Sequence, residues 1–270
     1  MALQGSSVKP KIVIDPDGTP VTVNVGIVQS LTPSSSTESI TEKGLGAVTK
    51  ERLTQHSFEF GWEGVLTDYQ VLEAGAADSG TGIPPTLDVY MHTELLNDAV
   101  VRSMTISGAE GEAVKYSLEG AFLSSTTGTA QTYDDPGAFF VYSDGTIAFG
   151  SETDEIKSFS ITVSRSVEPI YGTSMAPTDF TIGTTEYSGQ IELAASAMAQ
   201  AMEGAWDPAD PTFTATFEFE DPTDSGHTIS LTCTGCLVNA ADGSIDPDSE
   251  LTVTKSFKFE SLTISGGHES

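Results

Sequence analysis

The chain has 270 residues, and its 39 acidic against 11 basic side chains give a formal net charge of −28 at pH 7. This excess of acid excludes binding to nucleic acid through neutralisation of phosphates, and the length is enough for a large core without disulfides or metals. Such scarcity of Lys and Arg is typical of proteins from very high salt, where counterions screen repulsion between carboxylates; an ordinary acidic surface protein is the alternative.

The first 20 residues form an arm that contains Gly, Ser and Pro. They lack the basic stretch and following apolar run of a secretory signal, and no segment of the chain reaches the roughly 20 apolar residues of a membrane span. We therefore expect synthesis in the host cytoplasm and no contact with a membrane.

From residue 21 onward, apolar and polar residues alternate wherever turn residues are absent, which predicts a mainly β protein. Each such strand has one buried and one wet face, as in antiparallel sheets. The clearest examples are Phe58–Trp62, Phe159–Val163 and Phe213–Glu220. Two segments rich in Ala, Leu, Met and Gln predict short helices, at Thr67–Ala77 and Leu193–Ala205.

The two cysteines, Cys233 and Cys236, have the spacing of a redox or metal motif, but they lie in an alternating stretch typical of a strand interior. We interpret them as structural thiols. The four histidines are scattered, and the acidic stretch Asp242–Glu250 lacks the spacing of a calcium loop, so no metal ligand is expected. There is no Gly-x-Ser-x-Gly elbow, no His beside a candidate nucleophile and no phosphate loop, which predicts a protein that is not an enzyme and needs no cofactor.

Three short segments recur in the same order in the two halves of the chain, which predicts an internal duplication. The matches are Val28–Pro33 with Ser164–Pro169, Trp62–Leu66 with Tyr187–Ile191, and Tyr116–Leu118 with Ile229–Leu231. The second match precedes the predicted helix in each half. The expected organisation is a first domain over 21–150, with a long insertion at 34–55, and a second domain over 151–270.

The second half also resembles the tail tube (major tail) proteins of long-tailed bacterial and archaeal viruses. The similarity lies in a strand over Ser158–Val167, the stretch Glu168–Gly172, the segment Tyr187–Leu193 entering a short helix, and a closing strand over Lys255–Glu260. The resemblance implies a β-sandwich with one flanking helix, whose copies pair their edge strands into a ring around a channel. Stacked rings then form the tube that carries the genome, and the acid load of this chain points to a haloarchaeal siphovirus.

Resemblance and duplication together predict two tandem antiparallel β-sandwich or barrel domains, each with a short flanking helix. If six such domains close a ring, three chains suffice, and the ring is a homotrimer with pseudo-sixfold symmetry. The other implied partners are tail terminator and tail-tip proteins, while viral DNA passes through without specific binding. The implied location is the tail of the virion.

An acidic channel would repel DNA phosphates and let the duplex slide. The candidates for its lining are acids opposite the apolar strand faces: Glu59, Glu63, Glu218 and Glu220. Contacts between stacked rings are assigned to the insertion at 34–55 and to Ile170–Phe180, because long loops without their own core usually contact a partner. The candidate stacking residues are Ser36, Glu42, Lys43, Lys50, Tyr171 and Met175.

Two other roles stay open on the sequence. One is a capsid-decorating or tail-tip structural protein of the same virus class, and the other is a secreted β-sandwich adhesin of a halophile. The missing signal segment argues against the adhesin. Long uniform tubes of the purified protein in electron micrographs would distinguish a tube protein from the other candidates.

Overall fold

The computed structural model describes residues 10–14, 21–23, 25, 27–43, 49–76, 86–91, 93–127, 138–152, 155–194, 212–244 and 251–267. Its strands are all antiparallel, and fifteen of them join in one sheet, which confirms the prediction of a mainly β, antiparallel fold. The elements are β1 (Pro10–Ile14), β2 (Val21–Val23), β3 (Ile27–Lys43), β4 (Thr49–Val65), α1 (Gln70–Ala76), β5 (Leu87–Met91), β6 (Glu94–Ala109), β7 (Lys115–Ala121), β8 (Ser124–Thr127), β9 (Gly145–Phe149), β10 (Glu155–Ser164), β11 (Val167–Ile170), β12 (Asp179–Ile182), β13 (Glu186–Ala194), β14 (Phe213–Asp221), β15 (Asp224–Ser244), β16 (Thr252–Lys258) and β17 (Ser261–Gly267).

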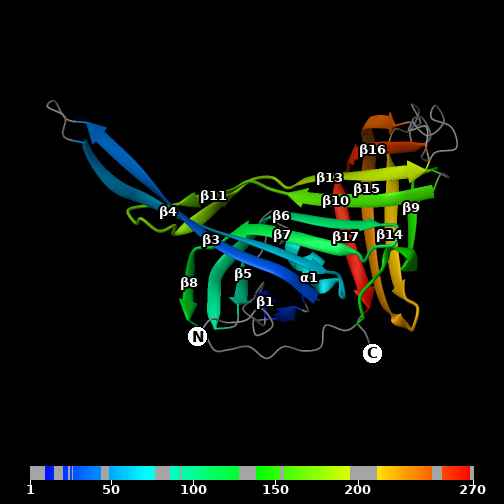
Figure 1. Cartoon of the computed structure of the whole chain (residues 1–270), viewed down its shortest axis with the longest axis horizontal. Helices are drawn as coiled ribbons and strands as arrows, with labels where there is room; N and C mark the ends of the chain where they lie inside the picture. The colour runs from blue at the N-terminus through cyan, green and yellow to red at the C-terminus, as the bar shows by residue number, and fades with distance from the viewer. Residues whose placement is uncertain are drawn as a thin grey trace.

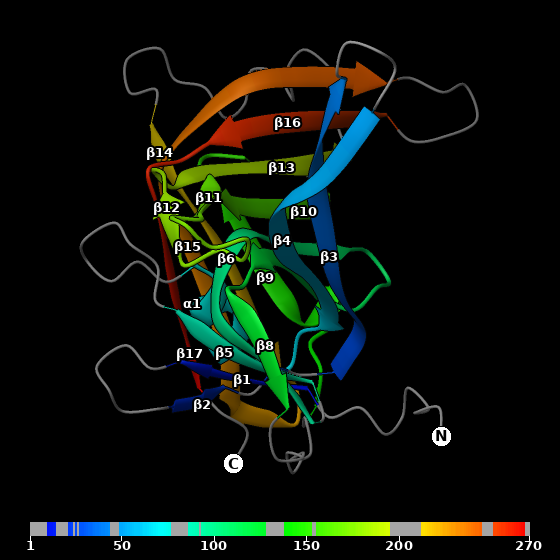
Figure 2. The same ribbon diagram turned by 90° about the vertical axis from the view of Figure 1, so that its left-hand side faces the viewer.

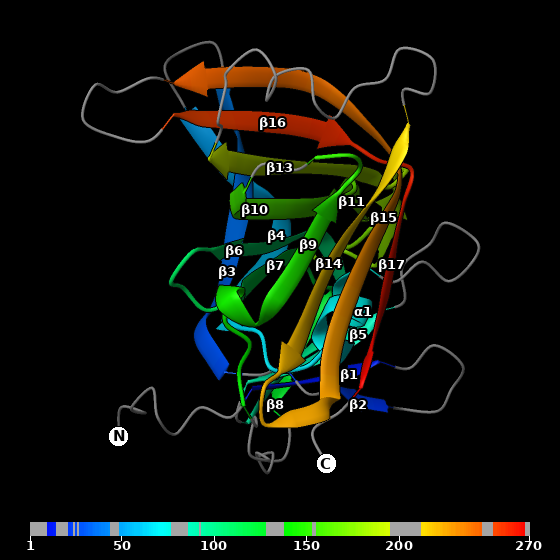
Figure 3. The same ribbon diagram turned by 90° about the vertical axis from the view of Figure 1, so that its right-hand side faces the viewer.

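The centre of the molecule is a run of strands in the order β3-β4-β7-β6-β10-β13-β16-β15, which we call the eight-strand layer. Two of its strands extend beyond it. The first part of β6 pairs with β5 and β8, and the first part of β15 pairs with β14 and β17. These extensions run at a steep angle to the eight-strand layer, so the sheet folds over on itself (Figures 1, 2 and 3).

The core fills the space between these folded parts of the sheet. Phe159 of β10 packs against Phe217 and Phe219 of β14, with ring centroids 4.9 and 5.8 Å apart. One cluster of buried apolar residues extends from Ile12 to Phe259 and draws on both halves of the chain. In the single chain, the two predicted domains therefore share a continuous core.

The first predicted helix is confirmed as α1, within the expected segment. It begins where a carboxylate oxygen of Asp68 accepts a hydrogen bond from the Gln70 N–H at 2.9 Å, as an N-terminal cap does. Its buried face packs on β6, where Gly75 leaves room for Met104. The second predicted helix lies outside the described residues except for Leu193 and Ala194, which end β13. No helix in the described part of the chain is both long and apolar enough to cross a membrane.

The expectation of a loop at 34–55 is wrong, because this insertion is the outer part of a two-stranded arm. Strands β3 and β4 pair from Ile27 opposite Val65 out to Lys43 opposite Thr49. The arm extends far beyond the rest of the molecule (Figure 1). Its strands, rich in Ser and Thr, need no core of their own, because the backbone ladder and cross-strand side-chain hydrogen bonds hold the two strands together. The Ser36 and Ser57 hydroxyls, for example, lie 2.6 Å apart. The expected N-terminal arm likewise contains a strand, β1, which pairs with β5.

The order of strands repeats along the chain. The run β3-β4-β7-β6-β5 is followed by the run β10-β13-β16-β15-β14. The strands correspond in that order, β3 to β10, β4 to β13, β7 to β16, β6 to β15 and β5 to β14, and strands that are neighbours in one run correspond to neighbours in the other. The flanking strands repeat as well, because β1 pairs with β5 as β9 pairs with β14, and β8 pairs with β6 as β17 pairs with β15. The two runs are joined side by side through pairing of β6 with β10.

Candidate functional site

One face of the eight-strand layer packs on the core, and the other, which we call the polar face, carries mainly hydroxyl side chains. On β10, the buried Phe159, Ile161 and Val163 alternate with residues of the polar face. The same alternation runs through β4, β6, β7, β13 and β16. The hydroxyl and amide residues of this face include Ser30, Thr32, Ser103, Thr105, Ser107, Ser117, Ser158, Ser160, Thr162, Ser164, Ser188, Gln190, Asn239, Thr254 and Ser256.

Hydrogen bonds between neighbouring strands link the side chains of the polar face. The Thr105 and Thr162 hydroxyls lie 3.2 Å apart, at the junction of β6 with β10. The Ser158 hydroxyl donates to Glu192 at 3.3 Å. Groups paired in this way are partly satisfied within the protein, so they offer few strong attachment points to a polyanion.

The polar face carries six acidic and three basic side chains, a smaller relative excess of acid than the 39 against 11 of the whole chain. Its acids are Glu59, Glu63, Glu119, Glu186, Glu192 and Asp242, and its bases are Arg102, Lys115 and Lys258. Arg102 donates to Glu59 at 3.0 Å, and Lys115 donates to Glu112 at 2.7 Å. Most of the acid of the chain therefore lies elsewhere.

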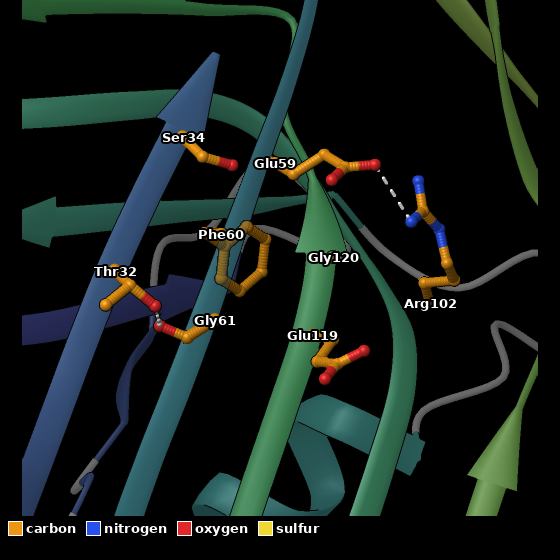
Figure 4. Close-up of a pocket in the computed structure, with 8 residues that line it drawn as sticks. All are labelled: Thr32, Ser34, Glu59, Phe60, Gly61, Arg102, Glu119 and Gly120. Atoms are coloured by element: carbon orange, nitrogen blue, oxygen red, sulfur yellow. Dashed lines mark hydrogen bonds and ion pairs between the residues drawn. The ribbon is translucent and has the colours of Figure 1, made fainter. Parts of the chain in front are cut away.

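Shallow hollows on the polar face each contain one of these bases. Figure 4 shows the hollow in which Arg102 reaches towards Glu59, with Glu119 further along β7. A second hollow, beside Gly64 and Tyr116, contains Lys115, and a third, beside Gly189 and Phe257, contains Lys258. The last two lie at corresponding places in the two runs of strands.

The four predicted lining acids do not lie on one surface. Glu59 and Glu63 are exposed on β4, on the polar face. Glu218 and Glu220 are exposed on β14, which lies in the part of the sheet that folds over the core. Alternation identified the exposed side of each strand correctly, but it does not tell which exposed sides form a common surface.

Three of the predicted stacking residues lie on or near the base of the arm. The backbone N–H of His56 donates to the carbonyl of Met175 at 2.8 Å, which attaches the loop between β11 and β12 to β4. Tyr171 is in the same loop, and burial, followed by the charge of Glu38, raises its pKa. Exposed apolar side chains also lie here, because Leu53 is 55% exposed and Met175 42%. Ser36 lies on β3 in the same stretch of the arm.

The other three predicted stacking residues, Glu42, Lys43 and Lys50, lie in the outer end of the arm. In the backbone register of β3 with β4, position 42 lies opposite position 50 and position 43 opposite position 49. They are thus separated along the arm from Tyr171 and Met175.

The two ends of the eight-strand layer are open edges. Within the described residues, β3 pairs only with β4, and the second part of β15 pairs only with β16. Sequence patterns did not identify this feature, because an edge is defined by which strands pair and not by the residues of any one strand.

Buried polar groups away from the polar face connect elements of the fold. His227 of β15 lies 2.6 Å, through Nε2, from the carbonyl oxygen of Thr67, and its Nδ1 lies 3.4 Å from Asp221. Hydrogen bonds from Thr223, with a smaller contribution from His227, lower the pKa of Asp221 to about 2. Lys255 and Glu152 form a buried ion pair.

Cys233 and Cys236 are buried and unbridged inside β15. Burial raises the pKa of both thiols, that of Cys236 to about 11, so both are protonated at neutral pH. This environment fits the interpretation as structural thiols. In the part of the chain that the structure describes, no three His, Cys, Asp or Glu side chains are grouped to hold a metal ion.

Comparison with known families gives one match. A family described as phage tail tube protein matches residues 16–203, from before β2 to beyond the end of β13. The match covers the whole first run of strands and enters the second. No curated protein matches the chain.

Proposed function

Because the chain belongs to the phage tail tube protein family, which makes it a structural component of the virion tail that assembles into a tube, we propose that three copies close into each ring of that tube. The observation that carries this proposal is the junction of β6 with β10. It joins two equivalent runs of strands side by side inside one chain, and the same joint repeated between chains produces a ring.

The proposal includes a duplication of the tube domain. Two glycines mark equivalent positions in the two runs. A Cβ on Gly64 would lie 2.8 Å from the ring of Tyr116, and a Cβ on Gly189 would lie 2.3 Å from the ring of Phe257. An aromatic side chain of the neighbouring strand thus covers a glycine in both places, which supports two tandem copies. Because β1 corresponds to β9, we place β1 in the first copy and β9 in the second, so both copies begin earlier than the expected 21–150 and 151–270.

The residue pairs along the hydrogen-bonded strands, or ladders, support only one of the three sequence matches as it was aligned from the sequence. Trp62–Leu66 and Tyr187–Ile191 remain equivalent, because they contain the two glycines. By the ladders, however, the counterpart of Tyr116 is Phe257 and not Ile229, and the counterpart of Val28 is Ile161 and not Ser164. The duplication therefore rests on the strand order more than on the sequence matches.

Three chains place 24 strands in the wall of the channel, eight from each. A closed barrel of that many strands, about 4.8 Å apart and tilted by about 40°, has a backbone diameter of roughly 48 Å. Such a lumen, even after side chains are added, is wide enough for a DNA duplex. The ring is then a homotrimer with pseudo-sixfold symmetry.

In this arrangement the polar face lines the channel. Glu59 and Glu63 are proposed as lining residues, together with the hydroxyl groups between them, whereas Glu218 and Glu220 lie on the folded-over part of the sheet. Viral DNA passes along a wall whose few bases are mostly paired with carboxylates, so the phosphates meet little positive charge that could retain them.

The arm and the loop between β11 and β12 are proposed as the contacts between stacked rings. Both project from the same side of the molecule (Figure 1), and exposed apolar residues lie where they meet. The proposed stacking residues are the predicted ones: Ser36, Glu42, Lys43, Lys50, Tyr171 and Met175. Tail terminator and tail-tip proteins would cover the two ends of the tube.

Electron microscopy of the purified protein tests the proposal. We expect long tubes of uniform width, whose averaged cross-section has three chains and six similar lobes per ring. Six chains per ring would contradict the trimer and the role of the duplication. Discrete particles without tubes would favour the alternative of a capsid-decorating or tail-tip protein.

We also propose a halophilic, haloarchaeal virus as the source, supported by the charge of −28. Far-UV circular dichroism between molar salt and about 0.05 M salt should show loss of β structure at the low end, because the Debye length grows past about 10 Å and repulsion between carboxylates acts over longer distances. An unchanged spectrum at low salt would contradict the halophilic origin but not the tube.

A further inference from the structure

Each open edge of the eight-strand layer carries an exposed apolar side chain. Ile27, at the start of β3, is 36% exposed, and Leu237, at the start of the unpaired stretch of β15, is 42% exposed. The described strands leave the outer side of both stretches unpaired. Unpaired N–H and C=O groups beside apolar side chains form a template for another strand.

The chain contains a completed version of this joint. In the repeated strand order, β10 is the counterpart of β3, and β6 is the counterpart of β15. β6 and β10 pair without interruption from Ser103 opposite Ser164 to Ala109 opposite Ser158. Their register can be transferred to the open edges if the corresponding residues are known.

The covered glycines define the correspondence on one side of the joint. Val28 of β3 lies opposite Gly64, and Ile161 of β10 lies opposite Gly189. Val28 therefore occupies the place of Ile161. Both side chains point towards the core, as expected for equivalent positions.

The aromatic residues that cover these glycines define the correspondence on the other side. Tyr116 pairs with Ile106 of β6, and Phe257 pairs with Val238 of β15. Val238 therefore occupies the place of Ile106. Since Ile106 lies opposite Ile161 inside the chain, Val238 is placed opposite a Val28.

The next position along the strands is on the polar face. Ser30 lies opposite Glu63, and Thr162 lies opposite Ser188. Glu63 and Ser188 each precede a covered glycine, so Ser30 corresponds to Thr162. On the other side of the joint, Leu237 lies opposite the residue after Phe257, and Thr105 lies opposite the residue after Tyr116, so Leu237 corresponds to Thr105.

We propose that the open edge of β15 pairs with β3 of the next copy of the chain, antiparallel, with Val238 opposite Val28 and Leu237 opposite Ser30. This inference rests on the proposed ring and specifies its contact between chains. The partner is a second copy, because the internal joint shows that these two kinds of edge fit each other.

The proposed joint also accounts for the two exposed apolar residues. Continuing the register places Ala240 opposite Ile27 of the next chain. Leu237 and Ile27 are then diagonal neighbours on the same face, about 7 Å apart, within reach of each other's side chains. In one chain they lie at opposite ends of the layer, where no described strand supplies such a neighbour. Ring closure therefore buries both.

A disulfide across the joint tests the register. We expect S30C/L237C, oxidised after assembly in high salt, to give covalent dimers and closed trimers on a non-reducing gel in place of single chains. Directly opposed residues of antiparallel strands have Cα atoms about 4.5–5.5 Å apart, which suits a disulfide. The native thiols do not compete, because they are buried and protonated.

Two matched controls accompany this variant. T105C/T162C occupies the equivalent positions inside one chain and should be oxidised without changing the number of chains in the band. T32C/L237C is displaced along the same face to roughly 7–8 Å, too far for a disulfide, and should remain single chains.

A variant that does not depend on oxidation completes the test. Leu237→Asp places a carboxylate in the joint, and we expect it to remain monomeric, with an unchanged circular dichroism spectrum, at salt concentrations where the unaltered chain forms rings.

Assembled tubes in which T32C/L237C is linked and S30C/L237C is not would overturn the register while leaving the tube function intact. Normal rings from Leu237→Asp would overturn the joint itself. Cross-linked ladders that end at six chains would support the joint and contradict the trimer. If the unaltered chain forms no rings or tubes in high salt, the proposed function fails, independently of the register.

Discussion

Shortening the arm should abolish tubes and leave rings. The change is replacement of residues 40–52 by Asn-Gly, which closes the hairpin directly beyond the pair formed by Ser39 and Leu53. Asn-Gly suits a two-residue turn between antiparallel strands. The variant retains the hydrogen bond from His56 to Met175, so the base of the arm and its attached loop stay in place.

The physical reason is that, among the described strands, Ile40–Lys43 and Thr49–Arg52 pair only with each other and project away from the rest of the molecule (Figure 1), so their loss should not disturb folding or ring closure. The removed segment includes the proposed stacking residues Glu42, Lys43 and Lys50. Electron microscopy should show single rings, and sedimentation should show a species of three chains. Tubes of normal length would contradict the assignment of stacking to the arm, and loss of rings as well would show that the arm acts in ring closure.

Removing the charge of Glu152 should destabilise the monomer more than any surface substitution. Lys255 lies on the core face of β16. Its side chain is 1% exposed, and its ammonium group is paired with Glu152, which follows β9. Glu152→Gln leaves that ammonium group buried without an ionic partner. Breaking a buried pair in this way costs about 3–5 kcal/mol, because the remaining charge has lost both water and its counterion.

Urea unfolding at high salt, followed by circular dichroism, measures this effect. The double variant E152Q/K255M should recover most of that loss, since it leaves no charge buried without a partner. The other run of strands supports this expectation, because the position equivalent to Lys255 is the fully buried Val114. As a control, Glu112→Gln breaks the exposed pair with Lys115 and should leave the unfolding curve unchanged.

If Glu152→Gln proves as stable as the unaltered chain, then the pair does not stabilise the core. If the double variant is as unstable as Glu152→Gln, then the loss comes from packing and not from an unpaired charge.

The sequence alone determined the local structure. Alternation depends only on a strand having a buried side and a wet side, so it correctly identified the buried faces of Phe159–Val163 and Phe213–Glu220 and the exposed sides that carry Glu59 and Glu63. Helix propensity likewise located α1. These features follow from residues a few positions apart. The internal matches predicted a duplication, but the repeated strand order that supports it comes from the structure.

Only the tertiary structure decided which strands are neighbours. The pairing of β6 with β10, the open edges of β3 and β15, and the pair of Lys255 with Glu152 join residues far apart in the chain. Serine-rich strands of the arm have no apolar face, so the sequence gives no periodic signal that would separate them from a loop. Two of the three internal matches failed in the same way, because short alternating segments resemble one another wherever they occur. The match of Val28 with Ser164 is three residues away from Ile161, and the match of Tyr116 with Ile229 lies on β15 in place of β16. Only the pairing of the strands, through glycines covered by an aromatic ring, excludes the wrong alignments.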